Sequence, residues 1–222
     1  MGRDNDFEGK VIALTGGASG IGLATARMLH ARGASVAIAD IDQAALDNAA
    51  QLLSSASERV QVTKLDVSDN SAVTAWTKSI LEEFGKLDGA ANCAGVIGKH
   101  HGTRKLSELE DDQWDLIMGV NLTGMMYCMR AELQAMKGPG SVVCVSSVQG
   151  TLGFAKHAAG SIETPLMHKR NALEGVDPSY TPTPINRLGT SEECGNLIAW
   201  LLSDESTFVS GATYSVDGGW AC

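Results

Sequence analysis

The sequence lacks the marks of several protein classes. Its 222 residues contain no apolar run long enough to span a bilayer, no low-complexity tract and no repeat at a fixed period. The five cysteines are odd in number and scattered, without a C-x-x-C pair of the kind that chelates zinc or cycles between redox states. These absences argue against a membrane-spanning protein and a solenoid or propeller, and they predict reduced thiols and no metal site.

Basic residues are also in short supply. Lys and Arg number 17 against 26 Asp and Glu, which gives a formal net charge of −9. Such a field repels polyphosphate and anionic lipid, so it argues against nucleic acid or a membrane surface as a partner. A small molecule is the expected partner.

The length and the N-terminus suggest a simple organisation. With 44% hydrophobic residues, the chain can bury one substantial core, and we expect residues 1–222 to form one domain. The first residues are polar with no apolar stretch behind them, and Asp6 stands where a myristoylation signal has Ser or Thr. The expected location is cytoplasmic.

Short apolar runs rich in β-branched residues alternate with helical segments along the first two thirds of the chain. This alternation is typical of a parallel sheet covered on both faces, so we predict an α/β fold with a doubly wound, Rossmann-type sheet. Helices are expected from near Ile21, Asp42, Ser71 and Gln113, and over Ser191–Leu202. Strands are expected at residues 11–14, 35–39, 60–65, 87–91, 141–145 and 212–216, and the proline-rich residues 177–184 are expected to form a loop.

A glycine-rich turn links the first predicted strand to the first helix. It reads T-G-G-A-S-G-I-G from Thr15 to Gly22. Gly16 permits a tight turn, Gly20 allows backbone to approach a pyrophosphate, and Gly22 permits close packing of helix on sheet. The helix N-terminus offers N–H groups and partial positive charge to the phosphates, although such a turn can also occur without a ligand. The candidate cofactor-binding residues here are Gly16, Ser19, Gly20, Ile21 and Gly22.

Asp40 ends the second predicted strand about 20 residues beyond the glycines. A carboxylate at this place can accept hydrogen bonds from both hydroxyls of the adenosine ribose and repels a 2′-phosphate. No Lys or Arg lies within the turn or just after Asp40. The pattern favours NAD over NADP; the alternative role of Asp40, a helix cap, can be filled by Asp42 instead.

Further motifs follow the turn in a particular order. Together with T-G-x-x-x-G-x-G, they resemble the short-chain dehydrogenase/reductase family over almost the whole chain. The resemblance implies an NAD(P)-dependent oxidoreductase that interconverts a secondary alcohol and a ketone. The motifs are Asp66, Asn92-Cys93-Ala94-Gly95, Asn121, Val145-Ser146-Ser147, Gly160-Ser161-Ile162-Glu163-Thr164-Pro165 and Val216-Asp217-Gly218-Gly219.

The resemblance also implies roles for cofactor-binding residues. Asp66 would meet the adenine edge, and Asn92 and Gly95 would line the adenosine ribose side. Ile162 and Thr164 would hold the nicotinamide carboxamide. Three of these residues have a local alternative: Asp66 can cap a turn, Asn92 can be a turn residue, and Thr164 can be a helix N-cap.

Two catalytic candidates come from the same resemblance. Ser147 would hydrogen-bond the reacting carbonyl or hydroxyl, and Asn121 would hold a water of the proton relay; either could instead satisfy local backbone. The family's signature, a Tyr with a Lys four residues later, is absent. The residues four positions after Tyr127, Tyr180 and Tyr214 are Ala131, Pro184 and Gly218.

The sequence is short at one junction. Lys156-His157-Ala158-Ala159 runs directly into Gly160, where roughly thirty residues, one helix and one strand of a βαβ unit, are absent relative to the family. His157 and Lys156 could substitute for the missing acid or be solvated loop residues.

Three interpretations stay open: an oxidoreductase represented by a shortened variant or an imperfect exon assignment, a non-catalytic NAD-binding subunit, and a chain without a competent fold. Residues 212–216 must either slide inward beside residues 141–145 or remain a detached edge, and we expect the first, which would give a six-stranded sheet. The helix near Gln113 would lose a packing neighbour, so a homo-oligomer with an altered interface is possible.

Overall fold

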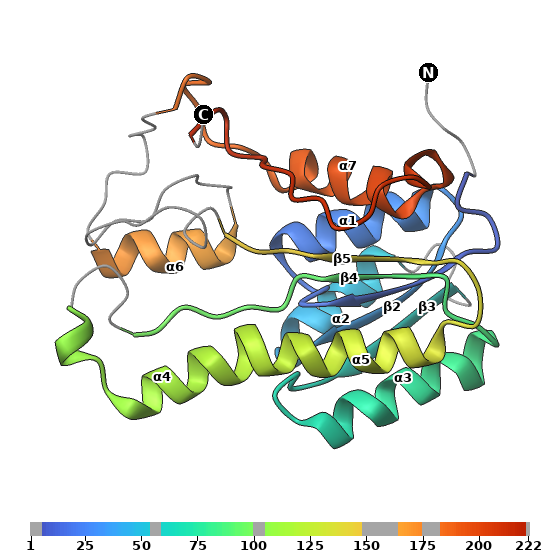
Figure 1. Ribbon diagram of the computed structural model, residues 1–222, viewed down its shortest axis with the longest axis horizontal. Helices are drawn as coiled ribbons and strands as arrows, with labels where there is room; N and C mark the ends of the chain where they lie inside the picture. The colour runs from blue at the N-terminus through green and yellow to red at the C-terminus, as the bar shows by residue number, and fades with distance from the viewer. Residues whose placement is uncertain (1–5, 54–58, 100–104, 148–163, 175–182, 221–222) are drawn as a thin grey trace.

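Strands and helices alternate along the chain in this computed structural model, which describes residues 6–53, 59–99, 105–147, 164–174 and 183–220 (Figure 1). The strands are β1 (Val11–Thr15), β2 (Ser35–Asp40), β3 (Val60–Lys64), β4 (Gly89–Asn92) and β5 (Ser141–Cys144). The helices are α1 (Gly20–Ala31), α2 (Gln43–Leu52), α3 (Asn70–Phe84), α4 (Asp111–Met118), the π-helical segment η3 (Gly119–Gly124), α5 (Met125–Ala135), α6 (Pro165–Glu174) and α7 (Ser191–Leu202), with short 3-10 turns at Leu106–Glu108 and Asp204–Ser206.

All five strands are parallel and lie in the order β3-β2-β1-β4-β5. Ile12 of β1 is in register with Val36 on one side and Gly89 on the other. The chain therefore builds outward from β1 to β3 and then crosses to the opposite side of β1. Ligands of open α/β sheets bind at the carboxyl ends of the strands where this reversal occurs.

Helices cover both faces of the sheet, as Figure 1 shows with α1 and α7 on one side and α3 and α5 on the other. Alternate residues of β1 enter the two layers. Ile12 and Leu14 belong to the core beneath α1, α2 and α7, whereas Val11 and Ala13 belong to the core beneath α3 and α5. The strand is apolar throughout because both of its faces are buried. The predicted single-domain, doubly wound α/β fold is confirmed.

Local signals predicted most helix starts to within two residues. Asp42 accepts the Ala45 N–H at 3.1 Å and caps α2. Asp69 caps α3, and Thr190 forms a capping box with Glu193 at the start of α7. Helix α7 has the predicted bounds, whereas α6 was not predicted. None of the helices in the described ranges is both long and apolar enough to cross a membrane.

The predicted sixth strand is wrong. Residues 212–216 form no strand, and the first four of them are exposed. The Tyr214 ring instead packs edge-to-face on Trp200 of α7, with 6.2 Å between centroids, and the Gly218 carbonyl accepts the Ile185 N–H at 3.0 Å. Residues 212–216 therefore add no ladder to β5, which is the last strand of the described sheet on that side. The sheet nevertheless forms with five strands, which argues against the interpretation of a chain without a fold.

Candidate dinucleotide site

The carboxyl edge of the sheet brings together candidates from separate strands. Backbone bonds join the neighbouring loops there. The Gly17 N–H donates to the Ala39 carbonyl at 3.1 Å, the Cys93 N–H to Thr15 at 3.0 Å, and the Val145 N–H to Asn92 at 2.9 Å. The glycine-rich turn therefore lies between the residues that follow β2 and those that follow β4.

The glycines of the turn occupy positions where a side chain would be strained or would clash with nearby backbone. Gly16 and Gly20 have φ of 60° and 50°, a region that side chains disfavour. A Cβ on Gly16 would lie 2.7 Å from the Ala94 Cα, and one on Gly22 would lie 2.2 Å from the Gly16 carbonyl oxygen. The turn thus packs tightly against the loop after β4 and against its own helix.

Helix α1 begins without a side-chain cap. Ser19 occupies its N-cap position in extended conformation, but the hydroxyl makes no capping bond, and the first turn has no acidic residue. Helices α2, α3 and α7 all have side-chain caps. The Ile21 side chain packs against the core, so this residue can offer its first-turn backbone N–H. An anion placed before α1 would supply the missing cap.

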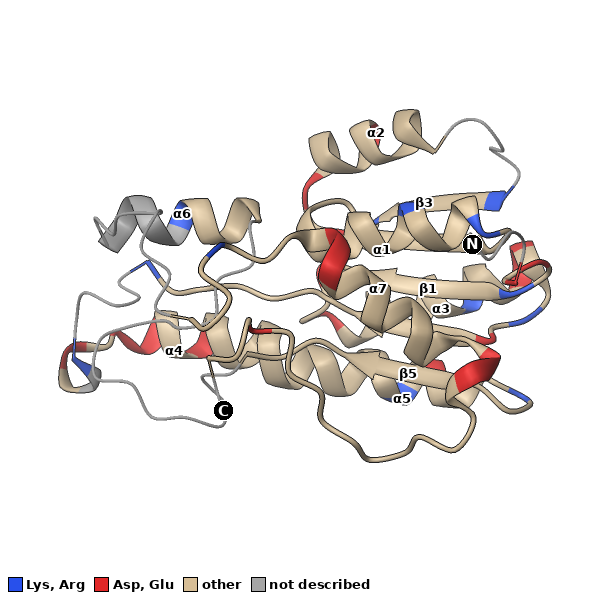
Figure 2. Ribbon diagram, turned by 90° about the horizontal axis from the view of Figure 1, so that it is seen from above, with Lys and Arg blue, Asp and Glu red and all other residues tan. Residues whose placement is uncertain are grey.

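Asp40 is held beside this helix end. Its two carboxylate oxygens accept the N–H groups of Ala18 at 3.2 Å and Asp42 at 3.1 Å. Since Asp42 caps α2, Asp40 is not needed as that helix's N-cap. Figure 2 shows that the connection from β2 into α2 is acidic, without Lys or Arg. A carboxylate that could accept hydrogen bonds from ribose hydroxyls therefore lies next to the uncapped end of α1.

One exposed residue at this edge escaped sequence analysis. Ile41 directly follows Asp40 and is 61% exposed. The Leu65 N–H donates to the Asp40 carbonyl at 2.8 Å, which brings the end of β3 alongside. An apolar side chain between two acidic ones can pack against an aromatic base, and its signal in the sequence is an isoleucine at the end of an otherwise buried strand.

Asp66 lies at the same edge but caps its own turn. Its Oδ1 accepts the Ser68 N–H at 2.9 Å and the Ser68 hydroxyl at 2.7 Å. The local alternative considered for this residue is therefore present in the structure. Its exposed position beside the end of β2 leaves the adenine-side role as a prediction.

The Asn92 side chain points into the core. Its Oδ1 accepts the Thr15 hydroxyl at 3.1 Å, and its Nδ2 donates to Glu132 Oε2 at 2.8 Å. All three side chains are about 1% exposed. Asn92 therefore supports the site from beneath rather than lining it. Glu132 was missed, although it recurs with Cys128 and Ala135 at the helical spacing of the buried face of α5.

Burial changes the acidity of groups around this point. It raises the pKa of the Glu132 carboxyl to about 7, and the hydrogen bond from Asn92 opposes this effect. Burial also raises the pKa of the Cys93 and Cys128 thiols to about 12, so both are neutral and poor nucleophiles. No group of three or more His, Cys, Asp or Glu suited to a metal ion occurs in the described ranges.

Asn121 lies within η3, where the helix widens between α4 and α5. Its Nδ2 donates to the Val96 carbonyl at 2.9 Å, and its Oδ1 accepts the Val96 N–H at 2.8 Å. The side chain thus clamps the loop that follows β4, near Gly95, whose Cβ position is 3.5 Å from Asn121 Oδ1. In the structure this side chain satisfies backbone groups of Val96, which is the alternative to the predicted role of holding a water.

The two remaining described candidates lie on either side of residues 148–163. Ser147 is exposed just after β5. Thr164 returns to the glycine-rich turn, since a Cβ on Gly20 would lie 3.2 Å from its Cγ2, and its Oγ1 accepts the Met167 N–H at 3.1 Å as an N-cap of α6. Ile162, Lys156 and His157 lie outside the described residues.

Neither described tyrosine occupies the position of a catalytic acid. Tyr127 packs on α5 with the Arg130 guanidinium 5.3 Å from its ring centroid, and Tyr214 packs on Trp200. Tyr180 lies outside the described ranges. The glycine-rich turn, Asp40, Asn121 and Ser147 thus lie in the loops that follow the strands or in η3, in a sequence without the tyrosine and lysine pair of the family motif.

Comparisons with known proteins agree with this arrangement. The family model described as short chain dehydrogenase matches residues 10–161, and the one described as Enoyl-(Acyl carrier protein) reductase matches residues 156–221. The two matches overlap at residues 156–161, which include the junction of Ala159 and Gly160.

Two curated relatives cover nearly the whole chain. "Short-chain dehydrogenase/reductase ABA4" of Pyricularia oryzae is 47% identical over 247 residues, 96% of this chain and 92% of the relative. "Cis-4-hydroxycyclohexanecarboxylate dehydrogenase" of Sinomonas cyclohexanicum is 33% identical over 246 residues, 96% of this chain and 97% of the relative. Because 96% of this chain is about 213 residues, about 34 positions of the first alignment are filled by the relative alone.

A solved structure shares the fold over its full length. It is titled "Short-chain dehydrogenase/reductase SDR:Glucose/ribitol dehydrogenase" from Brucella melitensis, with a TM-score of 0.87 and 29% identity. The match covers 97% of this chain and 98% of that one. The architecture is therefore shared even though this chain is shorter than its curated relatives.

Proposed function

Because this chain belongs to the short-chain dehydrogenase/reductase family of oxidoreductases, we propose that it binds NAD at the carboxyl edge of its sheet. We further propose that its parent reaction interconverts a secondary alcohol and a ketone. In this proposal the chain keeps the described dinucleotide-binding candidates and lacks the tyrosine and lysine of the proton-transfer site.

One observation carries the proposal: the uncapped start of α1 faces the Asp40 carboxylate across a turn that only glycines fit. The N–H groups at the start of α1 would hold the pyrophosphate. Asp40 would accept the adenosine ribose hydroxyls, and Thr164, next to Gly20, would lie toward the nicotinamide half. When bound, NAD supplies the hydride acceptor.

The preference for NAD over NADP rests on charge. Asp40 would face the 2′-phosphate of NADP across a short distance without a basic residue to compensate. We expect calorimetric titration to give at least about tenfold tighter binding of NAD, and Asp40→Ala to reduce this ratio. Asp47→Ala, on the exposed side of α2, is the matched control. Tighter binding of NADP, or an unchanged ratio in the Asp40 variant, would contradict the preference.

The proposed substrate is a cyclic secondary alcohol or its ketone, a class to which the name of the 33% identical relative belongs. Ser147 would hydrogen-bond the reacting oxygen, and Asn121 would support a water beside it. A family tyrosine, whose pKa near 10 is lowered by a lysine cation, would normally exchange the proton. Since this chain has no such pair, we expect it to bind NAD while reducing cyclic ketones very slowly.

A second candidate is a non-catalytic NAD-binding subunit, favoured by the same missing tyrosine and lysine. Sequencing of transcripts across the codons for Ala159 and Gly160 separates the two. A longer transcript that encodes the tyrosine and lysine would identify this chain as a shortened form of an enzyme. If every transcript has the short junction and the purified chain binds NAD without turnover, the subunit is supported.

A further inference from the structure

Two consecutive hydrogen bonds between buried side chains connect the start of the glycine-rich turn to α5. The Thr15 hydroxyl donates to Asn92 Oδ1 at 3.1 Å, and Asn92 Nδ2 donates to Glu132 Oε2 at 2.8 Å. Thr15 is the last residue of β1 and begins the glycine-rich turn, and Asn92 is the last residue of β4. The carboxylate at the far end sets the direction of both hydrogen bonds, because it can only accept when ionised.

The carboxyl of Glu132 lacks the partners that buried acids usually have. Its Oε1 accepts no hydrogen bond, and no Lys, Arg or His of the described ranges forms an ion pair with it. The titratable groups that act on it are the thiols of Cys128, on the same helix, and Cys144, at the end of β5. Both thiols have raised pKa values, so they stay neutral and provide no countercharge.

We propose that Glu132 is a positioning residue of the dinucleotide site, acting through Asn92 and Thr15, and that dinucleotide binding is coupled to protonation of its carboxyl. The inference rests on the proposed function. The carboxyl is two side chains away from the residue that opens the phosphate-binding turn. A bound pyrophosphate would add negative charge above that turn and disfavour a second negative charge in the dry core beneath it.

This arrangement also ties the two loops of the site together. A Cβ on Gly16 would lie within 2.7 Å of Ala94, so the turn after β1 and the loop after β4 are in contact. Losing the acceptor at position 132 would leave the Asn92 N–H group buried without a partner and free its amide to rotate. The spacing of the two loops, and with it the fit to the pyrophosphate, would then loosen.

Calorimetric titration of the full chain with NAD tests the proposal. At pH 7, titrations in buffers of low and high ionisation enthalpy report the protons taken up on binding. We expect uptake on the order of 0.3 proton per NAD in the unaltered chain, since the carboxyl is half-titrated near this pH. Glu132→Gln keeps an acceptor but cannot titrate, so its uptake should vanish while its affinity stays within about threefold.

Two further variants complete the test. Glu82→Gln changes an exposed glutamate on α3 that forms an ion pair with Lys78, and it should show the uptake of the unaltered chain. Glu132→Leu removes the acceptor, and we expect it to weaken NAD binding about tenfold, a loss that glutamine at this position avoids. Equal proton uptake by the unaltered chain and Glu132→Gln, with NAD bound by both, would overturn the role of Glu132 and leave the proposed function standing. If the unaltered chain does not bind NAD, the proposed function itself fails, and this inference with it.

Discussion

The two edge strands of the sheet, β3 and β5, differ in their content of polar and charged residues. β3, at one edge, reads V-Q-V-T-K, with polar residues at alternate positions and a lysine at its end. β5, at the other, reads S-V-V-C and continues into a further valine, without a charged residue. Edge strands of soluble proteins usually contain charges that discourage pairing with other chains. β3 therefore has the composition of an edge strand, whereas β5 has that of an interior strand.

This difference locates what the chain is missing. The 47% identical relative fills about 34 alignment positions that this chain lacks, and the two family matches overlap at residues 156–161, after β5. On the side of β1, β2 and β3, which includes the glycine-rich turn, the chain has the predicted strands. On the other side, the sheet ends at β5, and the segment that would contain the tyrosine and lysine is absent. If this interpretation is correct, NAD binding depends on the β1 to β3 side of the sheet, and proton transfer depends on the missing segment.

The largest expected effect concerns activity. The roughly thirty residues that this chain lacks relative to the family would comprise a helix with the tyrosine and lysine and one strand. Inserting such a segment between Ala159 and Gly160 would restore the strand beside β5 and the proton donor. A positioned acid is worth about 10²–10⁴ in rate, or roughly 3–5 kcal/mol, so turnover of NADH with cyclic ketones should rise by that factor. The measurement is the steady-state rate at saturating NADH.

The control is the same insertion with its tyrosine changed to Phe, which restores the sheet but not the acid. It should bind NADH like the active insertion and stay at the low rate. If the unaltered chain turns over at the rate of a working enzyme and His157→Ala abolishes this, a substitute acid exists and the division proposed above is wrong.

The second prediction concerns the buried carboxyl on the complete side. Between about pH 4.5 and 7, folded Glu132 keeps a proton that the unfolded chain has lost. Its contribution to the free energy of unfolding therefore falls as pH rises through this range, by about 3 kcal/mol in total, and the loss is complete above pH 7. Urea unfolding at a series of pH values should show Glu132→Gln gaining stability relative to the unaltered chain as pH rises.

The exposed variant Glu82→Gln should follow the unaltered chain across the same pH series. A difference between Glu132→Gln and the unaltered chain that stays constant with pH would mean that the carboxyl titrates normally and is more hydrated than its 1% exposure implies.

Sequence reasoning succeeded where neighbours along the chain decide the structure. The turn after β1, the cap at Asp42 and the helix Ser191–Leu202 depend on residues within one or two turns of each other. Asp40 was placed correctly beside the turn because parallel strands end at a common edge.

Sequence reasoning failed where contacts between residues distant in sequence determine the local structure. Residues 212–216 have the pattern of a strand, but they form no ladder with β5, and Tyr214 packs on Trp200 of α7. Glu132 recurs at the spacing of the buried face of α5, but its partner Asn92 lies 40 positions earlier in the chain. The local pattern can indicate that a residue is extended or buried, but it does not identify a partner so distant in sequence.

The third prediction compares glycines from the two sides of the sheet. Gly22→Ala would place a methyl group 2.2 Å from the Gly16 carbonyl oxygen, whereas Gly138→Ala, before β5, meets nothing within 4 Å. The first should cost about 1–3 kcal/mol of stability and weaken NAD binding at least about tenfold. The second should leave both unchanged, as measured by urea unfolding and calorimetry. Equal NAD affinities for the two variants would show that the turn does not contact the dinucleotide.

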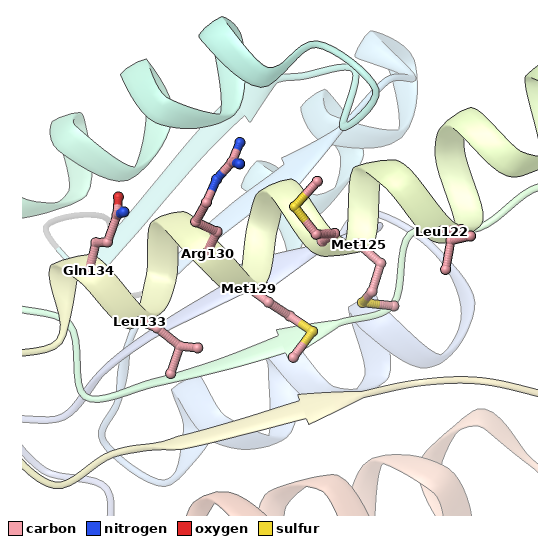
Figure 3. Close-up of a pocket in the computed structure, with 7 residues that line it drawn as sticks. Leu122, Met125, Met129, Arg130, Leu133 and Gln134 are labelled. Atoms are coloured by element: carbon pink, nitrogen blue, oxygen red, sulfur yellow. The ribbon is translucent and has the colours of Figure 1, made fainter.

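The last prediction concerns the helix next to the incomplete edge. Side chains of η3 and α5 line an apolar groove there, and Figure 3 shows Met129 and Leu133 directed away from α3, opposite to Arg130 and Gln134. Leu122 and Leu133 are each 59% exposed, more than a soluble monomer usually leaves on one helix face.

We expect this groove to drive association between copies of the chain, and Leu133→Glu to abolish it while changing the free energy of unfolding by only about 0.5 kcal/mol, because the side chain is already exposed. Leu52→Glu is the matched control: Leu52 is 51% exposed at the end of α2, on the complete side of the sheet. Sedimentation velocity over a range of concentrations should show self-association of the unaltered chain and of Leu52→Glu, and a monomer for Leu133→Glu. If both variants sediment like the unaltered chain, the exposed face of α5 is not where copies meet, and the incomplete edge has no consequence for assembly.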